Sequence, residues 1–268
     1  MALNLHAVTS RDDPRIAPYT AVRERDLTGR DGLFLVEGKV TLEVCITRAR
    51  FDLDSVFLEE GRVPVLAELL EKLPYSVPIY TAPQSLMDQI AGFPIHRGIL
   101  ACARKAPETD FGGWLSAQTG ATTLALCIGT SNHDNVGAVF RNCAALGADG
   151  VVLDETSCDP LYRKAIRVSA GTALWLPYYH GGSGETLLDT LKGEGWTIWT
   201  LTPGETATNL YKTPRPDRLC LVLGPEGPGL SDALLARGER VRIPMANAVD
   251  SLNVATSLAI ALSHRLSG

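Results

Sequence analysis

Residues 221–231 read Leu-Val-Leu-Gly-Pro-Glu-Gly-Pro-Gly-Leu-Ser, an apolar segment that runs into a loop rich in glycine and proline. The continuous apolar run at 219–223 predicts a strand buried on both faces. Three glycines and two prolines at 224–229 predict a loop whose backbone comes close to a ligand. The loop has no Lys-Ser/Thr pair and no G-x-G-x-x-G spacing, so it is neither a Walker A loop nor a dinucleotide fingerprint. Glu226 suits a cationic group, and Ser231 predicts the cap of a helix at 230–236. Taken alone, the stretch is also typical of an ordinary turn before a helix.

A helical pattern lies upstream, with apolar residues at 136, 139, 140, 143 and 146. Asn135 is placed to cap this helix at its N-terminus, and Gly147 is placed to end it. Gly137 lies in the first turn, where a glycine favours close approach of another backbone. Arg141 and Asn142 lie off the apolar stripe. The pattern leaves two interpretations of Arg141 open: a solvated side chain, or one at the mouth of a site that meets phosphate or ribose.

A third motif follows the glycine-rich loop. Ile243-Pro244-Met245 ends a strand, and a helix is predicted to begin at Asp250 or Ser251, with an apolar face at 252, 255, 259 and 262. Asn253 then lies in the first turn, where free amides and side chains point away from the helix end. The pattern is typical of a capped helix, and it leaves open whether the cap region also binds a ligand.

The rest of the chain predicts two α/β parts. The first hundred residues contain short strands and helices, and the polar residues 105–113, which include Pro and Gly, predict a linker. The apolar runs after the linker are continuous rather than alternating, which predicts a mostly parallel sheet covered on both faces. The predicted strands are 33–37, 54–58, 78–80, 98–103, 122–128, 150–153, 173–178, 196–201, 219–223 and 240–243. The predicted helices are 40–47, 63–72, 84–91, 136–146, 160–168, 184–192, 230–236 and 252–264.

Composition narrows the class of protein. The chain has 268 residues, 45% hydrophobic and 21% charged, with a net charge of −5. No apolar run is long enough to cross a membrane, and no secretory signal is recognisable, so we expect a cytoplasmic protein. Six cysteines without a CxxC pair and five histidines without ligand spacing predict no disulfide and no metal site. The acidic balance argues against nucleic acid, but local basic clusters occur at Arg11, Arg15, Arg23, Arg25 and Arg30, and at Arg163, Lys164 and Arg167.

The three motifs, in this order, resemble the signature of the SpoU/TrmH family of RNA ribose 2′-O-methyltransferases. Two stretches near the N-terminus, Ser10–Arg15 and Phe34–Gly38, resemble the substrate-binding domain at the front of many such enzymes, which is similar to ribosomal protein L30e. The resemblance implies an L30e-like domain at 1–106, a linker at 107–118 and a SPOUT catalytic domain at 119–268. It also implies a five- or six-stranded parallel sheet whose C-terminus forms a deep trefoil knot. Asp13 and the segment 246–250 depart from the commoner family sequence, but neither departure removes an expected functional residue.

The resemblance further implies a cofactor, an acceptor and an assembly. The cofactor would be S-adenosylmethionine, the acceptor RNA, and the protein a homodimer with the first motif near the interface. Arg141 of one subunit would then meet the cofactor of the other. The residues implied to bind the cofactor are Thr202, Gly204, Leu223, Gly224, Glu226, Gly227, Ile243, Met245, Ser251, Leu252 and Asn253. The catalytic set is Arg141, Asn135, Glu226, Ser251 and Asn253. The basic residues expected to bind RNA are Arg11, Arg15, Arg23, Arg163, Lys164 and Arg167.

The chemistry so implied is in-line transfer of a sulfonium methyl group to a ribose 2′-hydroxyl. It requires no metal, because the leaving thioether is neutral. Arg141 is the family's candidate base, but a guanidinium with a pKa above 12 is a poor base. We therefore expect Arg141 to orient the hydroxyl or a phosphate and to stabilise developing negative charge. We expect rRNA as the target, since an L30e-like domain suits structured RNA. The alternatives are a tRNA target, a non-catalytic RNA-binding protein, and an unrelated dehydrogenase. The absence of a G-x-G-x-x-G motif after the first strand of either half argues against the dehydrogenase.

Overall fold

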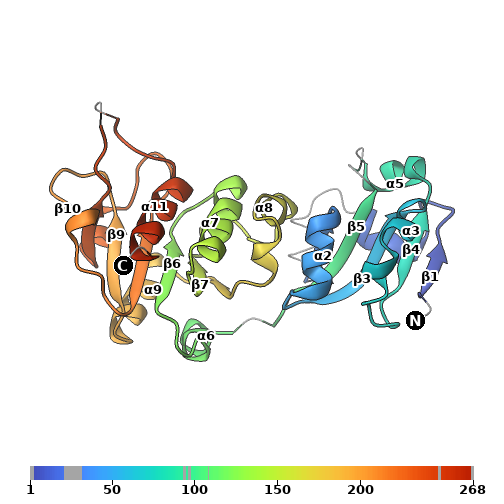
Figure 1. The fold of residues 1–268 in the computed structure, drawn as a ribbon, viewed down its shortest axis with the longest axis horizontal. Coiled ribbons are helices and arrows are strands. Elements are labelled where there is room, and N and C mark those ends of the chain that lie inside the picture. The colour runs from blue at the N-terminus through green and yellow to red at the C-terminus, as the bar shows by residue number, and fades with distance from the viewer. Residues whose placement is uncertain are drawn as a thin grey trace. The chain divides into compact units, whose positions relative to one another are not determined.

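The computed structural model describes residues 3–20, 32–92, 95, 98–107, 109–246 and 249–266. The chain forms two compact units, the first made of residues 1–107 and 161–175 and the second of 108–160 and 176–268. Figure 1 labels their helices and strands. Among the described helices, none is both long and apolar enough to cross a membrane.

The first unit contains a five-stranded mixed sheet in the order β1-β4-β3-β5-β2. Strand β4 pairs in parallel with β1 and β3, whereas β5 pairs antiparallel with β3 and β2. This arrangement agrees with the small α/β part expected from the sequence, although its likeness to L30e stays a prediction. The strands are β1 (Leu5–Ala7), β2 (Leu33–Glu37), β3 (Asp52–Glu59), β4 (Ile79–Ala82) and β5 (Ile99–Arg104). The helices are η1 (Pro14–Thr20), α2 (Lys39–Thr47), α3 (Arg62–Val65), α4 (Ala67–Leu70) and α5 (Gln84–Ala91).

Residues 161–175 belong to this first unit, although they lie within the range predicted as a continuous catalytic domain. They form α8 (Arg163–Val168) and η2 (Thr172–Leu174). The carbonyl of Leu174 accepts a hydrogen bond from the amide of Arg50 at 3.0 Å, and the Arg48 guanidinium lies 4.1 Å from the centre of the Trp175 ring. The strand predicted at 173–178 is therefore wrong. The apolar side chains of this run are buried by packing and not because the run pairs with a neighbouring strand. The nearest strand, β8, begins only at Tyr178.

The second unit contains a seven-stranded sheet in the order β10-β12-β9-β11-β6-β7-β8, in which every pair is parallel. The parallel sheet expected from the continuous apolar runs is confirmed. It has more strands than the five or six implied, because two short edge strands, β8 and β10, extend it. The trefoil knot stays a prediction. The strands are β6 (Thr123–Cys127), β7 (Gly150–Leu153), β8 (Tyr178–His180), β9 (Thr197–Leu201), β10 (Thr208–Asn209), β11 (Leu219–Leu223) and β12 (Glu239–Arg242).

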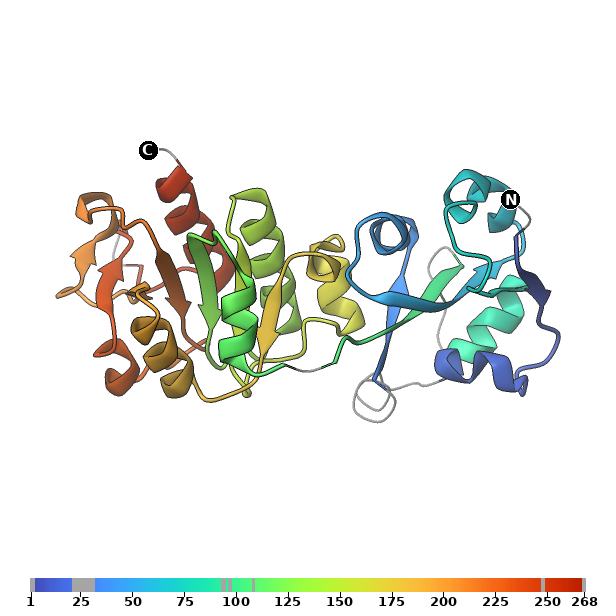
Figure 2. The same ribbon diagram turned by 90° about the horizontal axis from the view of Figure 1, so that it is seen from below.

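Helices cover both faces of this sheet (Figure 2). On one face, α6 (Phe111–Ala117), α9 (Gly184–Gly193) and α10 (Asp232–Leu235) bury leucines and aromatic rings against the strands. On the other face lie α7 (His133–Ala145) and α11 (Val254–Leu266), side by side in both views. Strand residues contact one face or the other in alternation, which is why a central strand such as β11 is apolar at every position. A short turn, η3 (Leu210–Lys212), follows β10.

Helix α6 lies inside the segment predicted as a linker. Asp110 caps it by accepting a hydrogen bond from the Gly113 amide at 2.9 Å. Phe111 and Trp114, one helical turn apart, are both only 8% exposed and belong to the core of the second unit. The polar residues, Pro and Gly of 105–113 predicted a linker, but the cap and the two aromatic side chains hold 111–117 as a helix.

Candidate functional site

A cavity of about 600 Å³ lies in the second unit where β9, β11 and β12 end. These three strands are neighbours and parallel, so the loops at their carboxyl ends meet at one edge of the sheet. The volume is in the range of small-molecule sites. All eleven residues that the sequence analysis assigns to a cofactor line it. Ten further residues, which were not predicted from the sequence, also line the cavity: Leu201, Pro203, Pro225, Pro228, Gly229, Leu230, Leu235, Val241, Val254 and Ser257.

The glycine-rich loop after β11 forms one wall of the cavity. At Gly224, a Cβ atom would lie 2.7 Å from the amide nitrogen of Leu230 and 2.9 Å from the carbonyl carbon of Gly229. The loop thus folds back on itself at this glycine, and no side chain fits there. On the neighbouring loop, a Cβ at Gly129 would lie 3.2 Å from Pro225. The two loops are therefore in close contact beside the cavity.

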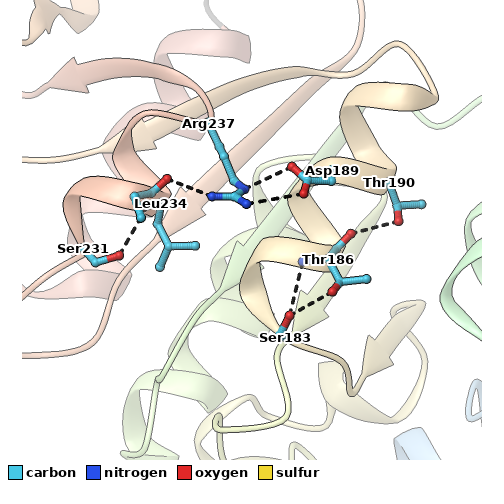
Figure 3. Close-up of polar contacts among 8 residues, drawn as sticks. Ser183, Thr186, Asp189, Thr190, Ser231, Leu234 and Arg237 are labelled. Carbon is cyan, nitrogen blue, oxygen red and sulfur yellow. Dashed lines mark hydrogen bonds and ion pairs between the residues drawn. The ribbon is translucent and has the colours of Figure 1, made fainter.

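The short helix after this loop is held at its start and near its end. The Ser231 hydroxyl oxygen accepts a hydrogen bond from the amide of Leu234 at 3.3 Å and caps α10, as predicted. Arg237 donates to Asp189 on α9 at 3.0 Å and to the carbonyl of Ala233 at 3.1 Å (Figure 3). These contacts fix the position at which the glycine-rich loop leaves the cavity.

A chain of polar side chains joins the three motifs. The Asn135 side chain, on a residue only 6% exposed, donates through Nδ2 to Oε1 of Glu226 in the glycine-rich loop. Its Oδ1 accepts a hydrogen bond from Nδ2 of Asn253 at 2.9 Å. The Asn253 Oδ1 in turn accepts from the amides of Ala255 at 2.9 Å and Thr256 at 3.3 Å. Three members of the predicted catalytic set thus form one connected network, and Asn135 orients the carboxylate at the cavity wall.

The structure corrects two predicted helix starts. Asn132 caps α7 by accepting a hydrogen bond from the Asp134 amide at 2.9 Å, and Asn135 lies inside the first turn. Asn253 caps α11, which begins at Val254 rather than at Asp250 or Ser251. Both segments contain several residues that favour caps. Sequence spacing does not reveal that Asn135 bonds distant residues from inside α7 while Asn132 caps the helix.

The remaining two predicted catalytic residues differ in position. Ser251 is exposed and lines the cavity. Arg141 is exposed on α7, makes no hydrogen bond or ion pair with any described residue, and does not line the cavity of its own chain. The single chain therefore does not bring the Arg141 guanidinium into this cavity.

Sequence reasoning missed a buried carboxylate behind the site. Asp154, 3% exposed at the end of β7, accepts hydrogen bonds from the amide of Gly129 at 2.9 Å and from the hydroxyl of Ser157 at 2.7 Å. The Ser157 hydroxyl oxygen also accepts from the amide of Thr130 at 3.0 Å. These bonds order the loop that leads into α7. The feature of the sequence that could have identified Asp154 is its place directly after a buried strand of the parallel sheet.

The basic residues expected to bind RNA lie in the first unit, and several are paired. Arg15 hydrogen-bonds Asp13 at 2.6 Å, and its guanidinium lowers the pKa of that carboxyl to about 2. Arg163 donates to Glu37 at 2.9 Å. Arg11 lies 3.9 Å from Asp12, and both side chains are largely exposed. Lys164 and Arg167 are exposed on α8. Arg23, Arg25 and Arg30 lie outside the described residues.

Because Asn253 both caps α11 and bonds Asn135, its replacement should lower the free energy of unfolding. Asn253→Ala removes the cap of α11, at a cost of about 1 kcal/mol, and also the bond to buried Asn135, worth about another 1 kcal/mol. The matched control is Ser231→Ala, which removes only the bond that caps α10 (Figure 3). Urea unfolding should show a loss about twice as large for Asn253→Ala. Equal losses would mean that the bond to Asn135 contributes nothing.

Comparison with known proteins places these features in a family. The sequence profile of the SpoU rRNA methylase family matches residues 123–263. An uncharacterized tRNA/rRNA methyltransferase of Mycobacterium bovis is 37% identical over 98% of this chain and 92% of its own length. The 23S rRNA (guanosine-2′-O-)-methyltransferase RlmB of Salmonella typhimurium is 28% identical over 85% of this chain and 96% of its own. The structure of an AdoMet-bound rRNA methyltransferase from Sinorhizobium meliloti has the same fold, with a TM-score of 0.82, 17% identity, and coverage of 98% of this chain and 97% of its own.

Proposed function

The chain belongs to the SpoU rRNA methylase family, and we propose that it transfers a methyl group from S-adenosylmethionine to a ribose 2′-hydroxyl of RNA, with rRNA as the target. One observation carries the proposal. The cavity at the ends of β9, β11 and β12 collects all eleven residues expected to bind the cofactor, and the Asn135–Glu226–Asn253 network joins the three family motifs beside it.

The lining of the cavity suits this cofactor. Apolar side chains such as Leu223, Ile243 and Leu252 can enclose the adenine ring, and the tight turn at Gly224 keeps the backbone of the glycine-rich loop at the wall. Glu226 offers an anionic oxygen for a cationic amino or sulfonium group. Bound S-adenosylmethionine would supply an electrophilic methyl group on a sulfonium sulfur. The structurally similar rRNA methyltransferase of Sinorhizobium meliloti, which has AdoMet bound, supports the same assignment.

In the transfer, the sulfur–carbon bond would break as a carbon–oxygen bond forms to the 2′-hydroxyl, the neutral thioether would leave, and the hydroxyl proton would pass to water. The protein's contribution is mainly positioning, which supplies several kcal/mol in well-oriented reactions (about 7–11 kcal/mol at most). Arg141 orients the ribose hydroxyl or a neighbouring phosphate and stabilises the negative charge that develops on the oxygen. It does not take the proton, because a guanidinium stays protonated at neutral pH. Ser251 lines the same cavity and completes the polar set.

The active form in this proposal is a homodimer in which Arg141 of one subunit acts at the cavity of the other. Two observations support it: Arg141 is exposed without a partner among the described residues, and it does not line the cavity of its own chain. The first unit would bind the RNA. Exposed Lys164 and Arg167 supply positive charge there, as phosphate recognition requires. The name of the Salmonella typhimurium relative supports rRNA over tRNA as the target.

Calorimetry with S-adenosylmethionine, with NADH as the control, tests the cofactor. We expect micromolar binding of the methyl donor alone. Transfer is then measured with radiolabelled donor on separate rRNA and tRNA fractions, and the sites are mapped as 2′-O-methyl groups. We expect label in rRNA. Radiolabel found only in tRNA would contradict rRNA as the target. If the folded protein does not bind the donor, the result would favour a non-catalytic RNA-binding protein.

A further inference from the structure

Two asparagines on one face of α7 both bind α11. Asn135 and Asn142 are seven residues apart, so their side chains differ in direction by about 20° around the helix. Asn135 accepts a hydrogen bond from Asn253, as described above. Asn142 donates through Nδ2 to the backbone carbonyl of Ala255, in the first turn of α11, at 2.8 Å. Figure 1 shows the two helices side by side. The helices are thus connected by polar bonds at two points along α7.

These bonds restrict rotation in a way that apolar packing does not. The faces of both helices toward the sheet are apolar, with Val139 and Phe140 on α7 and Leu258 on α11 fully buried. Apolar contacts stabilise such an arrangement without selecting one rotation strictly, since hydrophobic attraction is not directional. A hydrogen bond from a side chain to a fixed carbonyl requires one distance and direction. Asn142 therefore specifies how α7 is rotated against α11.

The rotation of α7 determines where Arg141 points. Arg141 directly precedes Asn142, so its side chain projects about 100° away from it around the helix. It is exposed and makes no bond of its own with the described residues, so within its own chain the backbone of α7 sets its direction. We propose that Asn142 is a positioning residue for methyl transfer: its hydrogen bond to Ala255 fixes the rotation of α7 and so directs the Arg141 guanidinium toward the acceptor. This inference rests on the proposed function.

The cofactor cavity is separate from this bond. Neither Asn142 nor Ala255 lines the cavity, although the adjacent Val254 does. Losing the bond should therefore alter the turnover step and leave donor binding intact. A purely structural role would lower stability and would not separate kcat from cofactor affinity in this way.

The test substitutes Asn142→Asp, which keeps the shape, removes the donor and places a carboxylate against a carbonyl. A displacement of about 1 Å in a reacting group can cost about 10²-fold in rate, so we expect kcat to fall between about tenfold and 10²-fold. The dissociation constant and KM for S-adenosylmethionine should stay within about twofold. The matched control is Gln118→Glu, which removes a similar part-buried bond, from Gln118 to the Trp114 carbonyl at 2.9 Å, on α6. It should lower the melting temperature similarly and leave kcat unchanged.

The outcomes separate this inference from the proposed function. If the unmodified protein transfers no methyl group, the proposed function fails, whatever Asn142 does. If it is active but Asn142→Asp keeps kcat within twofold, or loses kcat and donor affinity together, the inference about Asn142 is overturned. Asn142→Ala, which removes the donor without adding charge, serves where the aspartate variant does not fold. A selective loss of kcat in that variant supports the same conclusion, and an unchanged kcat overturns it.

Discussion

Gly224→Ala is expected to lower the affinity for S-adenosylmethionine by about tenfold to a hundredfold. The added Cβ would meet the Leu230 amide nitrogen at 2.7 Å and the Gly229 carbonyl carbon at 2.9 Å. Both are backbone atoms, so no change of rotamer relieves the contact, and the loop must open. Overpacking of this kind costs about 1–3 kcal/mol, and each 1.4 kcal/mol lost from binding is about tenfold in affinity.

The measurement is calorimetric titration of the variant beside the unmodified protein. Gly193→Ala is the control, because that glycine lies at the end of α9 with no atom within 4 Å of the added Cβ. It should bind the donor normally. A Gly224→Ala protein that is folded and binds the donor as tightly as the unmodified protein would remove the glycine-rich loop from the proposed cofactor site.

The sequence could predict that the cavity residues lie together, because they lie at or after the ends of three predicted strands. The runs at 196–201, 219–223 and 240–243 predicted three strands, and the structure places β9, β11 and β12 there as neighbours. In a parallel sheet their carboxyl ends share one edge, so the loops that follow must meet. The family resemblance then identified which residues of those loops to select.

Contacts between distant segments could not be predicted. The apolar run at 173–176 indicates burial, but it does not reveal that residues 161–175 pack in the first unit. Asn132, Asp134 and Asn135 all favour a cap, and the sequence does not reveal that Asn135 lies inside the helix and bonds Glu226 and Asn253, 91 and 118 residues away. The interaction of Asn142 with Ala255 is likewise decided by how α7 and α11 pack.

Arg141→Ala is expected to abolish methyl transfer and to leave donor binding intact. Removing one preorganised donor that stabilises developing charge costs about 10²–10³-fold in rate. The side chain is exposed and unpaired among the described residues, so stability should change by less than about 0.5 kcal/mol. Lys192→Ala, an exposed cation on α9 at the opposite face of the sheet, is the control and should be fully active. Loss of donor binding in Arg141→Ala would contradict the assigned role.

Mixing the Arg141→Ala and Gly224→Ala variants, at a donor concentration too low to fill the Gly224→Ala cavity, tests whether the site is shared between subunits. An Arg141→Ala subunit retains an intact cavity, and a Gly224→Ala subunit retains an intact Arg141. If Arg141 acts at the cavity of the other subunit, each mixed dimer contains one complete site, because the intact cavity then faces the intact guanidinium. Co-expression with two affinity tags and purification through both isolates the mixed dimer. It should recover about half of the activity of the unmodified dimer, one site of two. If Arg141 serves its own chain, neither site is complete and the mixed dimer stays inactive, which would place the guanidinium and the cavity of one chain together and overturn the shared site.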